Sequence, residues 1–123
     1  SKKNIVIEFV CPASLPIMID KAIPIGLIIN ELITNAYKHF KNETQNKIQL
    51  IITKDSNSDK TNSYTLKYTE SNHDFNAEIF HENNATFGLR LIKLLCNQIG
   101  GEMIILNKEE RGLLLHFKVN LYE

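Results

Sequence analysis

The sequence predicts one domain with a two-layer α+β fold, in which a mostly antiparallel mixed sheet of about five strands carries helices on one face. Its 123 residues suit a single domain and can bury roughly two-thirds of the chain's surface without disulfide or metal crosslinks. Two segments show the hydrophobic period of a helix, whereas the other apolar segments are short and rich in β-branched residues. Helices that share one face of a sheet form a two-layer sandwich.

The first strand and the first helix are predicted from a change in hydrophobic period. Residues 5–10 are apolar and largely β-branched, and therefore favour a strand. From Asp20, which can cap a helix, apolar residues recur at spacings of three and four as far as about Phe40, with Pro24 placed in the first turn. The predicted buried face of this helix consists of Ile25, Ile28, Ile29, Leu32, Ala36 and Phe40.

The rest of the chain indicates a hairpin, a long loop, a second helix and two final strands. Gly100 and Gly101 are expected to end the second helix as a C-cap, and Cys96 is expected to face the core from that helix. The predicted elements are a strand over residues 47–54, a polar loop over 55–62, a strand over 63–69, a loop over 70–85, a helix from about Thr86, and strands over 102–107 and 112–122.

Charge and composition exclude several classes of function. Fourteen Lys and Arg residues balance fourteen Asp and Glu residues, so we expect no nucleic-acid partner and no direct membrane contact. The longest apolar run, residues 23–29, is too short to cross a bilayer and is interrupted by Pro24 and Gly26. Cys11 and Cys96 lie far apart and have no metal-ligand spacing, which favours cytosolic thiols and a cytoplasmic domain.

A polar stripe on the first helix is the main candidate site. Glu31, Asn35 and Lys38 fall within about 60° of one another on a helical wheel. A carboxylate can orient or deprotonate a water, an amide oxygen can bind Mg²⁺, and an ammonium group can neutralise a phosphate. The spacing alone favours the plainer interpretation of a solvated helix face.

The segment over residues 23–40, IPIGLIINELITNAYKHF, closely resembles the N-box of the histidine-kinase ATPase domain. This motif is shared by the GHKL superfamily, which has the Bergerat nucleotide-binding fold, and the version here is similar to that of HWE-related sensor kinases. The resemblance implies that Asn35 binds the Mg²⁺ ion that bridges the phosphates of ATP. It also implies that Glu31 is a catalytic residue near the reacting phosphate, and that Lys38 and His39 reach phosphate oxygens.

A second segment, residues 86–102, resembles the G2 box and the helix that follows it. The resemblance implies that Gly88 and Leu89 open a helix whose N-terminus lies at the phosphates. That placement is physically sound, because free N–H groups and the positive end of the helix dipole favour an anion. With both motifs in the family's order, the resemblance covers nearly the whole chain.

Other positions depart from the family pattern. The family's G1 box, Asp-x-Gly-x-Gly, uses its Asp to accept the adenine amino group. In this chain Glu70 takes the place of the Asp, and Asn72 and Asp74 take the places of the glycines. Near the last strand the family often has Gly-Thr, whereas here Gly112 is followed by Leu113. The phosphate side of the site therefore matches the family, and the adenine side is degenerate.

The resemblance implies one histidine-kinase-like ATPase domain over residues 1–123, cut from a longer two-component sensor kinase, either with or without a membrane anchor. With ATP and Mg²⁺ bound, it would present the γ-phosphate to a histidine on the kinase's dimerisation domain, and would act on a response regulator only indirectly. The isolated domain is expected to be monomeric, because the missing helices mediate dimerisation in this family.

Two alternatives remain open. In the first, the degenerate G1 box marks a pseudo-ATPase that regulates a protein partner without binding nucleotide normally. In the second, His73 and His81 form a surface metal site with carboxylates of the loop over residues 70–85, although solvated histidines are the simpler interpretation. None of the chain's four histidines resembles a phosphoacceptor, and His116 is expected at the surface or at a sheet edge.

Overall fold

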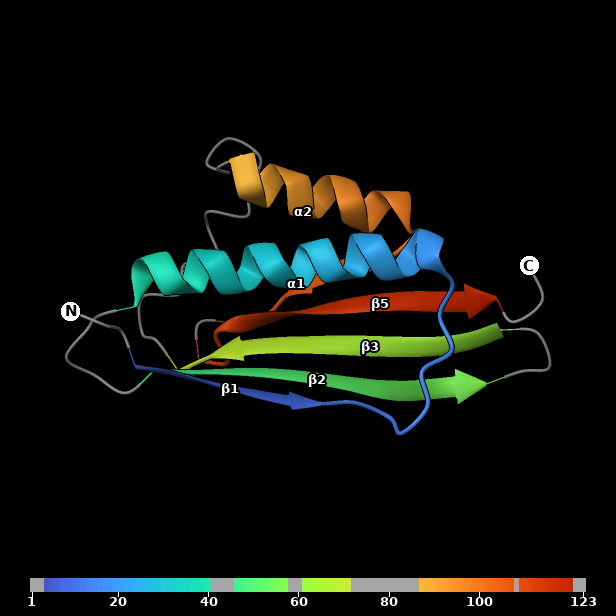
Figure 1. The fold of residues 1–123 in the computed structure, drawn as a ribbon, viewed down its shortest axis with the longest axis horizontal. Helices are drawn as coiled ribbons and strands as arrows, with labels where there is room; N and C mark the ends of the chain where they lie inside the picture. Colours follow the sequence, from blue (N-terminus) through green and yellow to red (C-terminus); the bar gives the residue numbers. More distant parts are fainter. Residues whose placement is uncertain (1–3, 41–45, 58–60, 72–86, 108, 121–123) are drawn as a thin grey trace.

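The computed structural model describes residues 4–40, 46–57, 61–71, 87–107 and 109–120. Five strands form one sheet, and both helices of the described part lie on the same side of it (Figure 1), which confirms the predicted two-layer α+β fold. In chain order the elements are β1 (Ile5–Val10), α1 (Ile19–His39), β2 (Asn46–Asn57), β3 (Thr61–Glu70), α2 (Phe87–Gln98), β4 (Glu102–Ile105) and β5 (Gly112–Asn120).

The strand order in the sheet is β1-β2-β3-β5-β4, with β3 at the centre and β1 and β4 at the edges. β1 pairs with β2 in parallel, because α1 carries the chain back across the sheet between them, and the other pairs are antiparallel. In this register Tyr68 of β3 lies between Leu50 of β2 and Leu113 of β5. The mixed, mostly antiparallel sheet matches the expectation from sequence.

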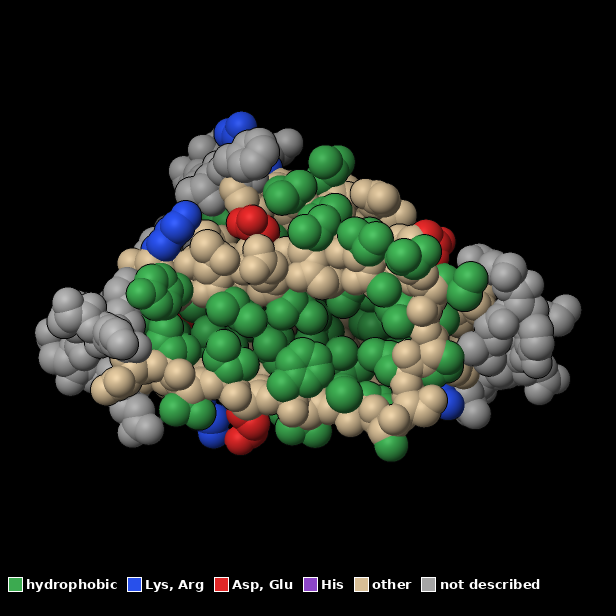
Figure 2. Space-filling view, in the orientation of Figure 1, with side chains coloured by type: hydrophobic (Ala, Val, Ile, Leu, Met, Phe, Trp, Pro, Cys, Tyr) green, Lys and Arg blue, Asp and Glu red, His purple; other side chains and the backbone are tan. Residues whose placement is uncertain are grey.

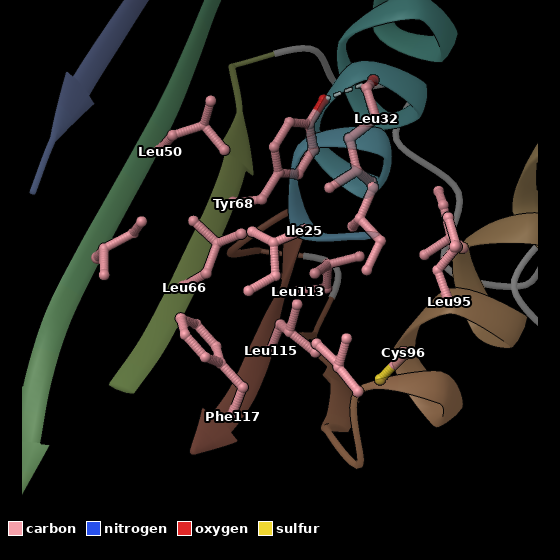
Figure 3. Packing of buried hydrophobic residues seen from close by; sticks show 14 of the residues in the cluster. Ile25, Leu32, Leu50, Leu66, Tyr68, Leu95, Cys96, Leu113, Leu115 and Phe117 are labelled. Carbon is pink, nitrogen blue, oxygen red and sulfur yellow. Dashed lines mark hydrogen bonds between the residues drawn. The ribbon is translucent and has the colours of Figure 1, made fainter. Parts of the chain in front are cut away.

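The core lies between the sheet and the two helices. Alternate residues of β3, among them Leu66 and Tyr68, point into it and are fully buried. Figure 3 shows them facing side chains of α1 and α2, with Cys96 on the α2 side. Cys96 is buried, as predicted, and burial raises the pKa of its thiol. The apolar faces of strands and helices thus meet as the patterns indicated.

The start of α1 differs from the prediction. The helix begins at Ile19, its N-cap is Met18, and no side chain caps it. Asp20 therefore lies inside the first turn and does not cap the helix. Its carboxylate interacts favourably with the positive end of the helix dipole. Pro24 is the sixth helical residue, beyond the first turn where it was expected, and its missing N–H leaves the Asp20 carbonyl without the usual helical donor.

The hairpin loop is also shorter than predicted. β2 runs on to Asn57 and β3 starts at Thr61, so both strands extend into the polar segment over residues 55–62. A register shift between Lys54 and Ser56 accommodates this extension. The polar composition of the segment predicted a loop, but strand pairing uses main-chain groups and does not require apolar side chains.

Helix α2 ends as predicted at its glycine pair. Gly100 has a φ angle of 68°, and the Gly101 N–H donates to the carbonyl of Cys96 at 2.9 Å, which together form a left-handed C-cap. The following strand, β4, ends at Ile105, two residues earlier than expected. Neither helix in the described part of the chain is long and apolar enough to cross a membrane.

One part of the inner face is left open. Ile7 and Phe9 of the edge strand β1 lie beside core residues of β2, and each is about half exposed, at 48% and 50%. Figure 2 shows hydrophobic side chains reaching the surface between α1 and the strands below it. On this same face α2 lies toward the opposite edge of the sheet, where it contacts both α1 and β4.

Candidate functional site

Three element ends meet at one end of the molecule: the last turns of α1, the first turn of α2 and the end of β3 (Figure 1). They carry most of the residues that the sequence singled out. From residue 72 to residue 86 the chain lies outside the described residues, so the predicted roles of Asn72, Asp74, His73 and His81 stay predictions. The described residues contain no group of three or more His, Cys, Asp or Glu side chains arranged to hold a metal ion.

Gly88 brings the two predicted motifs together. A Cβ atom on this residue would lie 2.5 Å from Glu31 Oε2 and 3.8 Å from Asn35 Nδ2. The first separation is shorter than real Cβ contacts allow, so glycine permits the start of α2 to approach this face of α1. The polar stripe is therefore not an ordinary solvated face, because Glu31 and Asn35 face the start of the second helix.

Asn35 has a buried polar atom that lacks a partner. Its Nδ2 is inaccessible to solvent, and within the described residues nothing accepts a hydrogen bond from it. A buried donor left unsatisfied costs about 1–3 kcal/mol, so such a group in a folded protein calls for an explanation, and a bound ligand is one. A phosphate oxygen would satisfy the donor, and the amide oxygen of the same side chain is a ligand that Mg²⁺ accepts.

The remaining phosphate-side predictions have mixed outcomes in the structure. Lys38 is exposed near the end of α1, where its ammonium group can reach an anion. His39 is the last residue of α1, but its side chain lies outside the described set, so its role stays a prediction. The Leu89 side chain is only 1% exposed and packs in the core, which restricts its predicted role to the main chain.

On the other flank of α1, Glu70 is joined to the helix through Tyr68. The Tyr68 hydroxyl lies 2.5 Å from Glu70 Oε2. It also lies 3.3 Å from the main-chain carbonyl oxygen of Leu32, a contact drawn in Figure 3. Leu32 follows Glu31 and precedes Asn35 by one helical turn. The phosphate-side and base-side candidates therefore meet over a single turn of α1.

Burial changes the acidity of both partners in this contact. Loss of solvent raises the pKa of the Glu70 carboxyl from 4.5 to about 7, and the Tyr68 hydroxyl, as a donor, opposes that rise. The same burial, together with the neighbouring Glu70, raises the pKa of the Tyr68 phenol above its ordinary value. Tyr68 therefore keeps its proton, whereas Glu70 changes protonation near neutral pH.

Sequence reasoning did not identify Tyr68 as part of the site. The available signal was its position two residues before Glu70, since residues i and i+2 of a strand share a face. Leu113, which departs from the family's Thr, lies opposite Tyr68 in the sheet and is buried. An apolar side chain at this position packs against the ring instead of offering a hydroxyl.

A separate polar row crosses the other face of the sheet. The Thr65 hydroxyl lies 2.5 Å from Asp55 Oδ2 and 2.6 Å from His116 Nδ1. Thr65 alternates with the core residues of β3, so this row lies on the face away from the helices. His116 is partly buried and points outward from β5, on the face away from the helices, which agrees with the surface position expected for it. The alternative, a position at a sheet edge, is wrong, because β4 rather than β5 ends the sheet.

Comparison with known proteins places the fold. No protein-family model matches the sequence, and no curated protein matches it. Solved structures do match: the histidine kinase domain of the Erythrobacter litoralis blue-light activated kinase EL346 aligns with a TM-score of 0.74 at 18% identity, over 98% of this chain and 53% of that one. The mycobacterial sensor histidine kinase MprB aligns with a TM-score of 0.61 at 14% identity, over 94% and 81%.

The chain has the fold of a histidine kinase catalytic domain. Full-length ShkA, solved in complex with AMPPNP, also matches, with a TM-score of 0.58 at 20% identity over 94% of this chain and 25% of that one. The chain spans about half the length of the EL346 histidine kinase domain. The fold that the sequence resemblance implied and the fold found by structural comparison therefore agree.

Proposed function

We propose that this chain is the ATP-binding catalytic domain of a two-component sensor histidine kinase. It would hold Mg²⁺ and ATP where α1, the start of α2 and the end of β3 meet, and present the γ-phosphate to a histidine on a separate dimerisation domain. The observation that carries the proposal is the buried Nδ2 of Asn35, which has no partner among the described residues and lies beside Gly88.

The residues at this place fit such a ligand. Asn35 would hold Mg²⁺ through its amide oxygen and donate to a phosphate oxygen through Nδ2. The bound cation would neutralise charge on the phosphates. The start of α2 at Gly88 would offer main-chain N–H groups and the positive end of the helix dipole, while Lys38 would reach the phosphates from α1.

Glu31 has the catalytic role in this proposal, as a carboxylate beside the reacting phosphate that orients the incoming group or accepts its proton. His39 would add a further phosphate contact, and Leu89 would contribute through its main chain. At the other flank Glu70 would accept a hydrogen bond from the exocyclic amino group of adenine. Catalysis would then rest on positioning and charge stabilisation, without a covalent enzyme intermediate.

The second candidate function is a pseudo-ATPase that regulates a protein partner. The observation in its favour is the Tyr68–Glu70 contact, because one carboxyl oxygen is already used inside the protein. A carboxyl with a pKa of about 7 is also a weaker acceptor at neutral pH than an ionised Asp. Both features would reduce affinity for adenine without altering the phosphate side.

Thermal unfolding with and without nucleotide tests the proposal. We expect a non-hydrolysable ATP analogue with Mg²⁺ at 100 times its Kd to stabilise the chain by about 2.7 kcal/mol, which raises Tm by several degrees. Asn35→Ala should abolish this rise. Asn30→Ala, on an exposed position of the same helix, is the matched control and should retain it.

The outcomes separate the two functions. A rise in Tm that is lost only in Asn35→Ala supports a nucleotide site, and phosphotransfer can then be assayed with a histidine-bearing dimerisation domain added. Absence of a rise at millimolar nucleotide would favour the pseudo-ATPase. An equal rise in wild type and Asn35→Ala would refute the role given to Asn35.

A further inference from the structure

The Tyr68–Glu70 pair has a hydrogen-bond pattern that depends on proton count. The Tyr68 hydroxyl is within hydrogen-bond distance of two oxygen atoms, Glu70 Oε2 and the Leu32 carbonyl, yet it carries a single proton. When Glu70 is ionised, that proton serves the nearer oxygen of the carboxylate. When Glu70 is neutral, its own proton can lie on Oε2 and point to Tyr68, which is then able to donate to Leu32.

In both states Oε2 is occupied by Tyr68, and the other carboxyl oxygen, Oε1, has no proton. Moving the carboxyl proton to Oε1 would give up the Tyr68–Leu32 hydrogen bond at the buried contact between β3 and α1, and this loss is unfavourable. Two of the charged groups near Glu70 have partners elsewhere: Lys47 of β2 lies 3.6 Å from Glu8, and Arg111, before β5, donates to the Ser71 carbonyl. Lys67 and Glu110, of opposite charge, line the same pocket as Glu70. From α1, Glu31 lies against Gly88.

We propose that Tyr68 is a positioning residue that determines base specificity: it holds the Glu70 carboxyl so that Oε1 acts only as an acceptor, which selects 6-amino purines and rejects 6-oxo purines. This inference rests on the proposed nucleotide function. An amino group donates to Oε1 in either protonation state of Glu70. A 6-oxo group places a second acceptor against Oε1 and leaves both unsatisfied.

Removing the Tyr68 hydroxyl deletes the hydrogen bond that holds the Glu70 carboxyl in one orientation. Tyr68 is fully buried, so Tyr68→Phe keeps the ring packed between Leu50 and Leu113 and deletes one oxygen. The donor that opposed the raised pKa of Glu70 is then lost, and the carboxyl is neutral at mildly acidic pH. Its O–H can now turn toward a 6-oxo group, so discrimination against guanine should fall at low pH.

The experiment measures Kd by calorimetry for non-hydrolysable ATP and GTP analogues with Mg²⁺, at about pH 6 and about pH 9. Wild type should prefer the ATP analogue at both pH values. Tyr68→Phe should lose about tenfold of that preference at about pH 6 and keep it at about pH 9, where Glu70 is ionised. Tyr64→Phe is the matched control, a buried tyrosine of the same strand whose hydroxyl lies near Asn62, and it should behave as wild type.

The contrary outcomes are distinct. Equal selectivity of Tyr68→Phe and wild type at about pH 6 overturns the inference and leaves the proposed function standing. An equal loss at both pH values reduces Tyr68 to a structural role and also overturns it. If Tyr68→Phe does not fold, the wild-type protein still tests the inference. A wild-type preference for the ATP analogue that disappears at about pH 6 would contradict a Glu70 Oε1 that acts only as a hydrogen-bond acceptor. Binding of neither nucleotide by wild type refutes the proposed function itself.

Discussion

At the scale of single residues, Gly88 and Gly112 are required because other atoms lie too close for a Cβ atom to fit. Backbone conformation is not the reason, since neither glycine has a positive φ angle. Gly88 makes room for a flexible carboxylate, that of Glu31, which could shift if a methyl group were added. Gly112 makes room for rigid main chain, because a Cβ there would collide with the Tyr68 carbonyl oxygen and lie 3.0 Å from Thr69 Cα. The first glycine therefore matters for the site and the second for the sheet.

We predict that Gly112→Ala destabilises the domain by about 2 kcal/mol or more, because β3 and β5 must separate at the centre of the sheet to admit the methyl group. Urea unfolding measures the free energy. Gly26→Ala is the matched control: a Cβ at this exposed position of α1 meets nothing within 4 Å. It should leave stability unchanged or raise it by up to about 1 kcal/mol. Equal losses in the two variants would contradict the steric explanation.

At the scale of elements, the ends of helices were harder to predict than their existence. The hydrophobic period of α1 predicted its buried face, and Ile25, Ile28, Leu32 and Ala36 are all buried. The same period does not determine where the helix begins, because capping signals such as Asp20 are weak and the connector before α1 also contributes Leu15 and Ile17 to the core. The end of α2 was predictable, since a left-handed cap strongly favours glycine.

The cap of α2 yields a prediction at this scale. Gly100→Ala should lower the free energy of unfolding by about 1–2 kcal/mol, because L-residues other than Asn and Asp resist a φ angle of 68°. Gly100→Asn should lose less, since Asn adopts this conformation more readily. Thermal or urea unfolding of the two variants provides the comparison. A smaller loss for Ala than for Asn would show that the left-handed conformation is not maintained in solution.

At the scale of the whole molecule, the buried Glu70 links folding to pH. Its pKa is about 7 in the folded chain and 4.5 in the open chain, so the folded state binds more protons between these values. The stabilisation is fully present below about pH 4.5 and is lost as the pH rises through about 7. The shift corresponds to a contribution on the order of 3 kcal/mol.

We therefore predict that Glu70→Gln reduces the fall in stability between about pH 4.5 and about pH 7, because a neutral amide does not titrate. Urea unfolding at a series of pH values gives the two slopes. Glu102→Gln, an exposed position on β4, is the control and should keep the slope of wild type. Identical slopes in Glu70→Gln and wild type would mean that Glu70 is ionised in the folded chain at mildly acidic pH.

The amino-acid sequence was enough to predict the fold class and the phosphate side of the candidate site. Local periodicity predicted the two layers and the buried face of α1, because these depend on spacing along the chain. Glu31, Asn35 and Gly88 were predicted to belong to one site from the resemblance of two motifs to a known family, since spacing alone favoured a solvated helix face. The packed structure was needed to show that Asn35 has a buried donor without a described partner, and that Tyr68 connects Glu70 to α1. Burial and contacts between distant segments arise when layers pack, and no local pattern encodes them.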